Sequence, residues 1–394
     1  MNTEADRDTG SHGGLIISTP VLVATIFVIC TAFSSQMLTP LWVGAIIDDY
    51  QFTERIAGRI ASIEFIIVGI VSLLIAARVH LFNVRSLSIV GLVCLLLGNG
   101  GSVLVTEITL LTVCRIVAGI GKGLIVAGIF SLFARTASPT RSFAVLNGSY
   151  SAFSAGFYLI VPFFVERDGA SGAFMIMFII TVLGSLLVWC VPTGRTAPTV
   201  TRSTSGPGSV GLAGILVLSA LVIIWAGNSA IWTFIERIGV RAGLEITRIG
   251  AVLSFSALLT ILGPTLAHIL HTRYGYRKPI IIALSMKIIV AAVLCNIISS
   301  TAFIFTTPLL NLIALFIIPY LMGLMSIADP KGRLAAAAAA AMTAGNSLGS
   351  YIGGITVTEA GYGVLSMISI SLFVLVMVLI HLTIKQMPGM KSEQ

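Results

Sequence analysis

Residues 114–128 read CRIVAGIGKGLIVAG, and every residue of this stretch except Arg115 and Lys122 is small or apolar. Such a composition is typical of a helix in the hydrocarbon core of a membrane. The two cations are unexpected there, because a charged side chain at the bilayer centre costs at least about 2.5 kcal/mol on insertion scales. The stretch therefore predicts a transmembrane helix whose cations face a partner or a water-filled cavity.

The whole chain shares this apolar character. Of its 394 residues, 57% are hydrophobic and only 10% are charged. The mean hydropathy of +1.04 lies far outside the range of soluble domains. The polar opening MNTEADRDTGSH does not resemble a cleaved signal peptide. The composition predicts an all-α polytopic membrane protein.

Other classes of protein find little support in the sequence. The five cysteines lie in apolar segments without C-x-x-C spacing, so we expect no metal site, and we expect no cofactor. The net charge of +8 is spread over short loops, which argues against a nucleic-acid partner. The GIGKG stretch lacks the glycine and the hydroxyl residue that a P-loop requires, so no nucleotide site is expected.

Twelve apolar segments are long enough to cross a membrane, which takes about 20 residues. They lie near residues 18–47, 56–78, 86–105, 108–134, 142–165, 172–192, 209–238, 246–270, 279–299, 303–325, 334–357 and 362–385. The polar stretch PTGRTAPTVTRSTSGPGS between the sixth and seventh segments has the composition of a flexible linker. We predict an N-terminal six-helix bundle at residues 1–192, a cytoplasmic linker at 193–208 and a C-terminal six-helix bundle at 209–394.

The lysines and arginines of the loops predict the orientation of these helices. Most of them fall on one side if both termini are cytoplasmic, and positive residues are retained on the cytoplasmic side. We therefore expect cytoplasmic termini in a plasma (inner) membrane protein.

The two halves of the sequence also repeat each other at an offset of about 192 residues, as expected for a duplicated transporter fold. ERIAGRIAS from Glu54 matches TRIGAVLSF from Thr247, and SPTRSFA from Ser138 matches DPKGRLA from Asp329. The matches keep one order and nearly one spacing. They predict two pseudosymmetric six-helix bundles.

The loop after the second segment, AARVHLFNVR at residues 76–85, resembles the G-x-L-A-D-R-x-G-R-R motif of the major facilitator superfamily. Arg85 matches the final arginine. His80 stands at the acidic position, and Asn83 stands at the glycine position, where an asparagine tolerates left-handed backbone angles. The second-half copy, HILHTRYGYR, keeps Arg273, Gly275 and Arg277. The resemblance implies that Arg85 and the three residues of the copy belong to gating loops, with a weakened latch.

The fourth segment strengthens this resemblance, because Arg115, Gly119 and Gly121 follow the family pattern R-x-x-x-G-x-G. The stretch from Gly148 to Pro162 resembles the glycine-rich fifth helix of the drug and sugar efflux branch, although it lacks the Gly-Pro pair. The chain is thus identified as a member of the major facilitator superfamily. That resemblance implies a monomeric transporter that is coupled to protons.

The family fold implies that segments 1, 4, 7 and 10 line a central cavity and that segments 3, 6, 9 and 12 face lipid. Lys287 in the ninth segment is the exception to an otherwise apolar lipid-facing set. We expect it to be a structural lysine that either snorkels to the surface or pairs within the bundle.

Glu64 is the one acidic residue deep within the apolar segments. It lies about 12 Å from the outer surface, while Lys122 lies about 21 Å inward on its own helix, at 1.5 Å per residue. Arg115 and Lys122 are seven positions apart and share one helix face. Glu64 is therefore either a member of a buried structural ion pair or a proton carrier.

The opposite half offers aromatic and amide groups. Trp225, Asn228 and Trp232 form one helical stripe, which indicates either packing or a ligand platform. Glu236 and Arg237 near the outer end predict a gate or a surface pair. With Arg115 and Lys122, the predicted substrate-binding set also includes Gln36, Asn147, Tyr150, Asn311 and Asn346.

These observations predict a secondary transporter that moves a small organic solute by alternating access. Proton-coupled efflux is the leading hypothesis, and proton-coupled uptake of an organic anion held by Arg115 and Lys122 is the alternative. A non-transporting receptor on the same fold is a third possibility. An enzyme is not expected, because the apolar segments hold no catalytic constellation such as paired carboxylates or HExxH.

Overall fold

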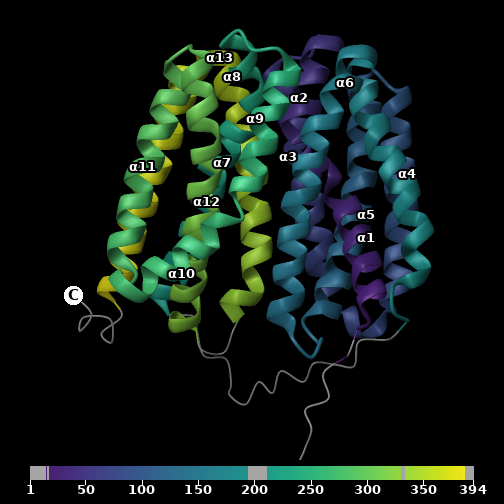
Figure 1. Cartoon of the computed structure of the whole chain (residues 1–394), viewed down its shortest axis with the longest axis horizontal. Coiled ribbons are helices and arrows are strands. Elements are labelled where there is room, and N and C mark those ends of the chain that lie inside the picture. Colours follow the sequence, from purple (N-terminus) through teal and green to yellow (C-terminus); the bar gives the residue numbers. More distant parts are fainter. Residues whose placement is uncertain (1–14, 16, 194–210, 330–332, 387–394) are drawn as a thin grey trace, which may run out of the picture.

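The structure is a computed structural model, and it describes residue 15 and residues 17–193, 211–329 and 333–386. These residues form helices joined by short loops (Figure 1). The predicted linker at 193–208 lies, apart from Thr193, outside the described residues. We refer to the described residues before this gap as the N-terminal half and to those after it as the C-terminal half.

The N-terminal half contains α1 (Thr19–Met37), α2 (Thr39–Asp49), α3 (Glu54–Ala76), η1 (Val79–Leu81), α4 (Val84–Leu104), α5 (Ile108–Phe133), α6 (Pro139–Leu187) and η2 (Val188–Cys190). The C-terminal half contains α7 (Leu212–Trp232), α8 (Ile235–Arg241), α9 (Ile246–Leu259), α10 (Leu262–Tyr274), α11 (Arg277–Asn296), α12 (Ser300–Ala328) and α13 (Arg333–Lys385). The end at which α1 and α7 begin and α13 finishes is called the terminal end, and the opposite end is called the distal end.

Ten stretches of the described helices are long and apolar enough to cross a membrane. Two of them, Pro139–Cys190 and Ala337–Lys385, have 52 and 49 residues, which is about twice the length that one crossing needs. Each is interrupted by a glycine with a positive φ, 61° at Gly169 and 78° at Gly361. Glycine adopts this left-handed region without the steric penalty of a Cβ atom.

Three of the predicted segments are not continuous helices. The first divides into α1 and α2 at Leu38, two residues before Pro40. Proline has no backbone N–H, so it cannot donate the hydrogen bond that a continuous helix would need at this position. The seventh divides into α7 and α8 after Thr233, and the eighth divides into α9 and α10 just before Gly263 and Pro264.

The two halves repeat the same order of helices. Ile246 of α9 follows Glu54 of α3 by 192 residues, and Ser300 of α12 follows Ile108 of α5 by the same number. The break between α1 and α2 has its counterpart in the break between α7 and α8. The spacing of the helices therefore agrees with the repeat in the sequence.

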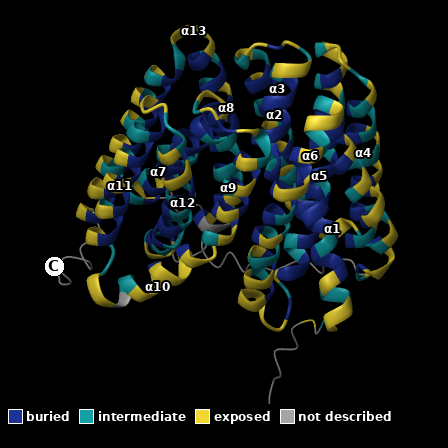
Figure 2. Ribbon diagram, turned by 45° about the horizontal axis from the view of Figure 1, so that its top comes forward, coloured by how far each residue is buried: buried dark blue, intermediate teal, exposed yellow. Residues whose placement is uncertain are grey.

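Apolar side chains cover the outward faces of the helices that were expected to face lipid. On α11, Ile282 and Ile289 are about 60% exposed, and on α4 Leu97 is 65% exposed. Figure 2 shows such exposed residues along α4 and α11, while buried residues fill the space between helices. Apolar surface of this kind is stable against lipid chains but not against water.

The halves meet mainly at the distal end. Arg55 of α3 donates its backbone N–H to Thr358 of α13 at 2.8 Å, and the Ser62 and Ser347 hydroxyls are 2.9 Å apart. On the other side of the interface, the halves also meet nearer mid-depth, where the Ser151 and Thr260 hydroxyls are 3.2 Å apart.

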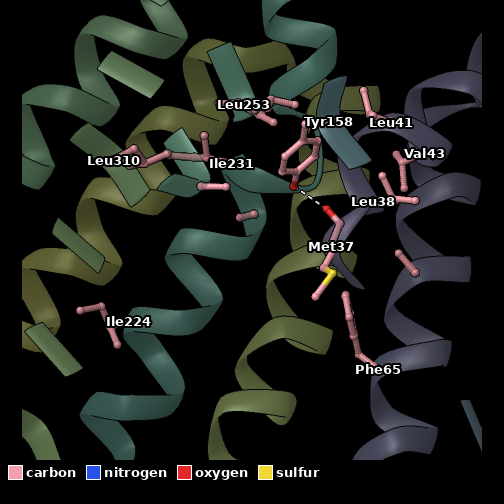
Figure 3. Close-up of a cluster of buried hydrophobic side chains, with 14 of the residues drawn as sticks. Met37, Leu38, Leu41, Val43, Phe65, Tyr158, Ile224, Ile231, Leu253 and Leu310 are labelled. Carbon is pink, nitrogen blue, oxygen red and sulfur yellow. Dashed lines mark hydrogen bonds between the residues drawn. The ribbon is translucent and has the colours of Figure 1, made fainter. Parts of the chain in front are cut away.

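A hydrophobic cluster fills the interface between these contacts. Tyr158 of α6 lies between side chains of both halves and donates a hydrogen bond to the Met37 carbonyl (Figure 3). Leu253 and Ile231 of the C-terminal half lie on one side of its ring, and Leu38 lies on the other. Polar contacts and apolar packing together close the distal end of the molecule.

Candidate functional site

Glu64 lies on the inward face of α3, about 15 Å from the distal start of that helix at 1.5 Å per residue. Its side chain is 2% exposed. The Ser35 hydroxyl of α1 donates a hydrogen bond to its Oε1. Its Oε2 lies 3.8 Å from Nη1 of Arg115, which makes an ion pair that is too long for a hydrogen bond. The predicted meeting of Glu64 with a cation is thus confirmed for Arg115.

Arg115 is held almost entirely by α4. Its Nη2 donates to the Gly98 carbonyl at 2.9 Å, to Asn99 Oδ1 at 2.9 Å and to Ser102 Oγ at 2.8 Å, and its Nε donates to Ser102 Oγ at 3.1 Å. The guanidinium carbon also lies 5.0 Å from the ring centroid of Phe174 on α6. Arg115 therefore joins α3, α4, α5 and α6. This geometry fits a structural role better than the predicted substrate contact.

Lys122 has a different environment on the same helix. It is fully buried, yet its Nζ has no hydrogen-bond partner among the described residues. The rings of Phe33 and Phe65 lie beside it, each with its centroid 5.5 Å from Nζ. A cation over aromatic faces gains some attraction, but an unpaired buried ammonium remains costly. Lys122 is therefore a fully buried charged group without a hydrogen-bond partner among the described residues.

Three buried atoms of this cluster lack hydrogen-bond partners in the described part of the chain: Glu64 Oε2, Arg115 Nη1 and Lys122 Nζ. Both Glu64 and Arg115 lie close enough to Lys122 to interact with it electrostatically. With the three groups ionised, the cluster carries a net charge of one positive unit. Such a site favours an anion or an ordered water that can use the free donors.

The C-terminal half also contains a fully buried cation, Lys287 on α11. Its Nζ donates to Asn228 Oδ1 of α7 at 2.8 Å and to the Leu310 carbonyl of α12 at 3.0 Å. The predicted pairing within the bundle is thus confirmed, and snorkelling to the surface is not observed. The contact between Lys287 and Asn228 joins helices that are far apart in the chain, so the helical pattern of the sequence does not reveal it.

The other predicted binding residues have mixed environments. Tyr150 stacks edge-on against Phe33, with ring centroids 5.6 Å apart. Trp225 Nε1 is buried without a hydrogen-bond partner among the described residues. Asn147 is exposed. The half-buried members of the set are Gln36, Tyr150, Trp225, Trp232, Asn311 and Asn346.

The predicted gating loops lie at the terminal end. Asn83 has φ −82° and caps α4 by accepting the Arg85 backbone N–H at 2.9 Å. The expectation of a left-handed asparagine there was wrong, because the side chain caps the helix from an extended backbone. Arg85 Nε donates to the Val191 carbonyl at 2.7 Å.

In the second-half copy of this loop, Gly275 does adopt a positive φ, 64°. Arg277 Nη2 lies 3.5 Å from His381 Nδ1, whereas Arg273 is exposed. The copy thus keeps the turn but no carboxylate partner for these arginines among the residues that the structure describes.

The predicted pair of Glu236 and Arg237 belongs to a contact between the halves. Arg237 Nη2 donates to Asp48 Oδ2 of α2 at 2.6 Å, and Arg237 Nε donates to Glu236 Oε2 at 2.6 Å. Glu236 is only 1% exposed, so the pair is not a surface pair. We call Asp48, Glu236 and Arg237 the distal lock. A cavity of about 310 Å³ beside it is also lined by Asp49 and Glu166.

Asn99, Ser102 and Asp48 also belong to these clusters, although they were not predicted from the sequence. Asn99 and Ser102 are fully buried and three residues apart on an apolar helix, a spacing that places both side chains on one face. That spacing was the available signal. Among the described residues, no group of three or more His, Cys, Asp or Glu side chains could hold a metal ion.

The protein is a multi-pass membrane protein with buried charges inside its membrane-spanning helices and with two repeated halves that meet at one end. These are the features of a secondary transporter of small solutes. The sequence model of the Major Facilitator Superfamily matches residues 24–353, and the chain belongs to that family. It is a transporter and not an enzyme.

A comparison with solved structures supports the fold. The crystal structure of the nucleoside transporter NupG is similar to this chain with a TM-score of 0.71, and the alignment covers 93% of this chain and 98% of that one. The sequence identity is 11%, so the likeness concerns the fold alone. A search of curated proteins found no match.

Proposed function

We propose that this transporter carries a small organic anion together with protons, and that Glu64 is the proton carrier. The observation behind the proposal is the fully buried Lys122 ammonium, which lacks a hydrogen-bond partner among the described residues. An anionic solute would supply the missing counter-charge and accept its hydrogen bonds. The flanking rings of Phe33 and Phe65 suit a solute with an apolar or aromatic body.

The charges of the cluster favour transport of the anion and the proton in the same direction. Protonation of Glu64 would remove the negative charge beside Arg115 and Lys122 and would raise the affinity for an anion. By thermodynamic reciprocity, a bound anion would raise the proton affinity of Glu64 by the same factor. A cationic solute would instead compete with the proton, which is the arrangement that antiport needs.

We also propose how the helices cross the membrane and how the two bundles are oriented. Splitting the two longest spans at Gly169 and Gly361 yields the twelve crossings that the sequence predicts. We place both termini in the cytoplasm of a plasma (inner) membrane monomer, with residues 1–192 and 209–394 rocking against each other as two bundles. The distal end would then be the outer end, and the structure would represent an outward-closed state.

Proton-coupled efflux of a cationic solute is the second candidate. The acidic groups around the distal cavity favour it, since Asp48, Asp49, Glu166 and Glu236 outnumber Arg237 there. Such a surface would attract cations to the outer mouth. A nucleoside is a third probe, because the similar structure is that of a nucleoside transporter.

The test uses purified protein in proteoliposomes with a pH gradient of either sign and three labelled probes: benzoate, ethidium and uridine. We expect benzoate to accumulate on the side opposite the acidic compartment, together with protons. Glu64→Gln should abolish the dependence of benzoate uptake on the pH gradient while benzoate exchange continues. Glu245→Gln, which changes an exposed glutamate at the distal end, is the matched control.

Other outcomes would contradict the proposal in distinct ways. Ethidium movement against a proton flow, without benzoate movement, would support the antiport candidate instead. A Glu64→Gln protein with unchanged pH dependence would remove Glu64 from the coupling mechanism. Binding of a probe without transport of any probe would favour a receptor.

A further inference from the structure

Lys287 is a buried cation that the proposed mechanism does not use. It lies on α11, and its ammonium contacts three other helices of the C-terminal half. Two of these contacts are its hydrogen bonds to Asn228 and to the Leu310 carbonyl, and the third is the ring of Phe373, whose centroid is 5.1 Å from Nζ. Among the described residues, no carboxylate pairs with it.

The contact with Lys287 fixes the orientation of the Asn228 carboxamide. A lysine ammonium has three donors and no acceptor, so only the amide oxygen of Asn228 can face it. The oxygen is therefore occupied, and the NH₂ group is the part of the amide that remains for another partner. The Leu310 carbonyl accepts a second hydrogen bond from the same ammonium, so this contact leaves the orientation of the Asn228 amide unchanged.

The NH₂ group of Asn228 is both unpaired and accessible. No described residue accepts a hydrogen bond from Nδ2. Nδ2 is nevertheless not one of the fully buried polar atoms that lack a partner, so it keeps some accessible surface. Asn228 is 4% exposed as a whole residue, and Nδ2 contributes to that exposed part. Two N–H donors thus remain free at this position.

Asn228 lies at a depth similar to that of Lys122. It precedes Arg241, the distal end of α8, by 13 residues, while Lys122 follows Ile108, the distal end of α5, by 14 residues. At 1.5 Å per residue both lie about 20 Å from the distal end. A solute at this depth could meet donors from both halves of the transporter.

We propose that Lys287 is a positioning residue that makes Asn228 present N–H donors to the solute, so that this half of the site selects a group that accepts hydrogen bonds, such as a carboxylate. The inference rests on the proposed function and extends it to the C-terminal half. The fixed positive charge beneath the amide also polarises its N–H groups and disfavours a cationic solute.

The first part of the test needs no solute. Asn228→Asp keeps an acceptor for Lys287 but removes the N–H donors. In native protein this variant should melt within a few degrees of the parent, because the carboxylate pairs with the ammonium. In a Lys287→Met background the same change should lower the melting temperature strongly, because it leaves a buried carboxylate without a cation. Equal destabilisation in both backgrounds would overturn the proposed positioning role of Lys287.

The second part measures selectivity with benzoate and ethidium in proteoliposomes. Asn228→Asp should lower the ratio of benzoate to ethidium transport at least tenfold, whereas a purely structural defect would lower both rates together. Asn228→Gln, which keeps an amide, should restore part of the ratio. Asn296→Asp is the matched control, because Asn296 is exposed at the distal end of α11.

An unchanged ratio in a folded Asn228→Asp protein would overturn the inference while leaving the proposed function intact. If the parent protein moves neither probe, the proposed function fails, and the inference fails with it. The two failures are therefore distinguishable from the behaviour of the parent protein.

Discussion

Lys122 and Arg115 are buried to the same degree but differ in what they contact. Arg115 donates hydrogen bonds to Gly98, Asn99 and Ser102 and lies beside the Glu64 carboxylate. Lys122 has aromatic neighbours and no hydrogen bond to the described residues. A buried charge with satisfied partners resists removal, whereas an unpaired one lowers the stability of the fold. The two cations should therefore respond in opposite ways to neutralisation.

Arg115→Met should destabilise the protein by about 3 to 5 kcal/mol, because it leaves the Glu64 carboxylate and the α4 acceptors unpaired. Lys122→Met should leave the melting temperature unchanged or raise it, while benzoate transport is lost. Thermal unfolding in detergent measures the first effect, and the proteoliposome assay measures the second. A Lys122→Met protein that melts as low as Arg115→Met would show that Lys122 has a structural partner.

At the scale of single elements, the ends and breaks of the helices depend on local chemistry. Asp329 accepts the backbone N–H groups of Arg333 at 2.8 Å and Leu334 at 3.2 Å at the start of α13. The Arg333 guanidinium, 3.1 Å away, and these N–H groups hold the pKa of the Asp329 carboxyl below its ordinary value. This cap helps to fix α13, which lies along both α3 and α7.

The capping by Asp329 predicts a pH-dependent stability. Since its pKa is lower in the folded protein, its contribution is present in full above the unfolded pKa of about 3.9 and is lost as the pH falls through the folded value. Asp329→Asn should therefore lower the melting temperature at pH 7, and the difference from the parent should shrink below about pH 4.

The control for this prediction is Asp168→Asn in the distal turn, where an exposed pair with Arg167 contributes little. Melting curves between pH 3 and pH 7 measure both variants. A difference between parent and Asp329→Asn that is the same at every pH would show that the charge of Asp329 does not stabilise the helix.

At the scale of the whole molecule, the distal closure follows the internal repeat. Gly58 of α3 faces the backbone of α13, where an added Cβ would lie 2.5 Å from the Ser350 carbonyl. Gly250 of α9, 192 residues later, faces α6, where an added Cβ would lie 2.2 Å from the Tyr158 carbonyl. Ser350 and Tyr158 are also 192 residues apart. Two equivalent crossings, each permitted by a glycine, therefore bring the halves together.

Gly58→Ala and Gly250→Ala should each disfavour the closed distal end, because the added methyl group meets backbone atoms that cannot rotate away. Overpacking of this kind costs typically about 1 to 3 kcal/mol, which shifts a two-state equilibrium by roughly fivefold to a hundredfold. A disulfide between cysteines placed at Ser62 and Ser347, whose hydroxyls are 2.9 Å apart, would report the closed state.

We expect slower formation of this disulfide in both glycine variants than in the parent. Gly156→Ala is the matched control, since an added Cβ on that α6 glycine would meet nothing within 4 Å. Equal rates of disulfide formation in all three variants would show that the glycine crossings do not limit closure.

The class of the protein, its family and its internal repeat could be predicted from the amino-acid sequence, as could the apolar segments, although three of these segments are interrupted in the structure. A bilayer imposes these features locally, because each crossing must be apolar over about 20 residues. The sequence also singled out Glu64, Arg115, Lys122 and Asn228 as candidate site residues, since polar groups in apolar helices are conspicuous.

The folded structure was needed to show which of these groups meet. Arg115 turns to Asn99 and Ser102, Lys122 is left among aromatic rings, and Lys287 orients Asn228 from a helix 59 residues further along the chain. The helical period gives the face on which a side chain lies but not the helix that packs against that face. Pairing between helices depends on close packing of distant segments, so the partner of each buried charge was decided by the folded structure.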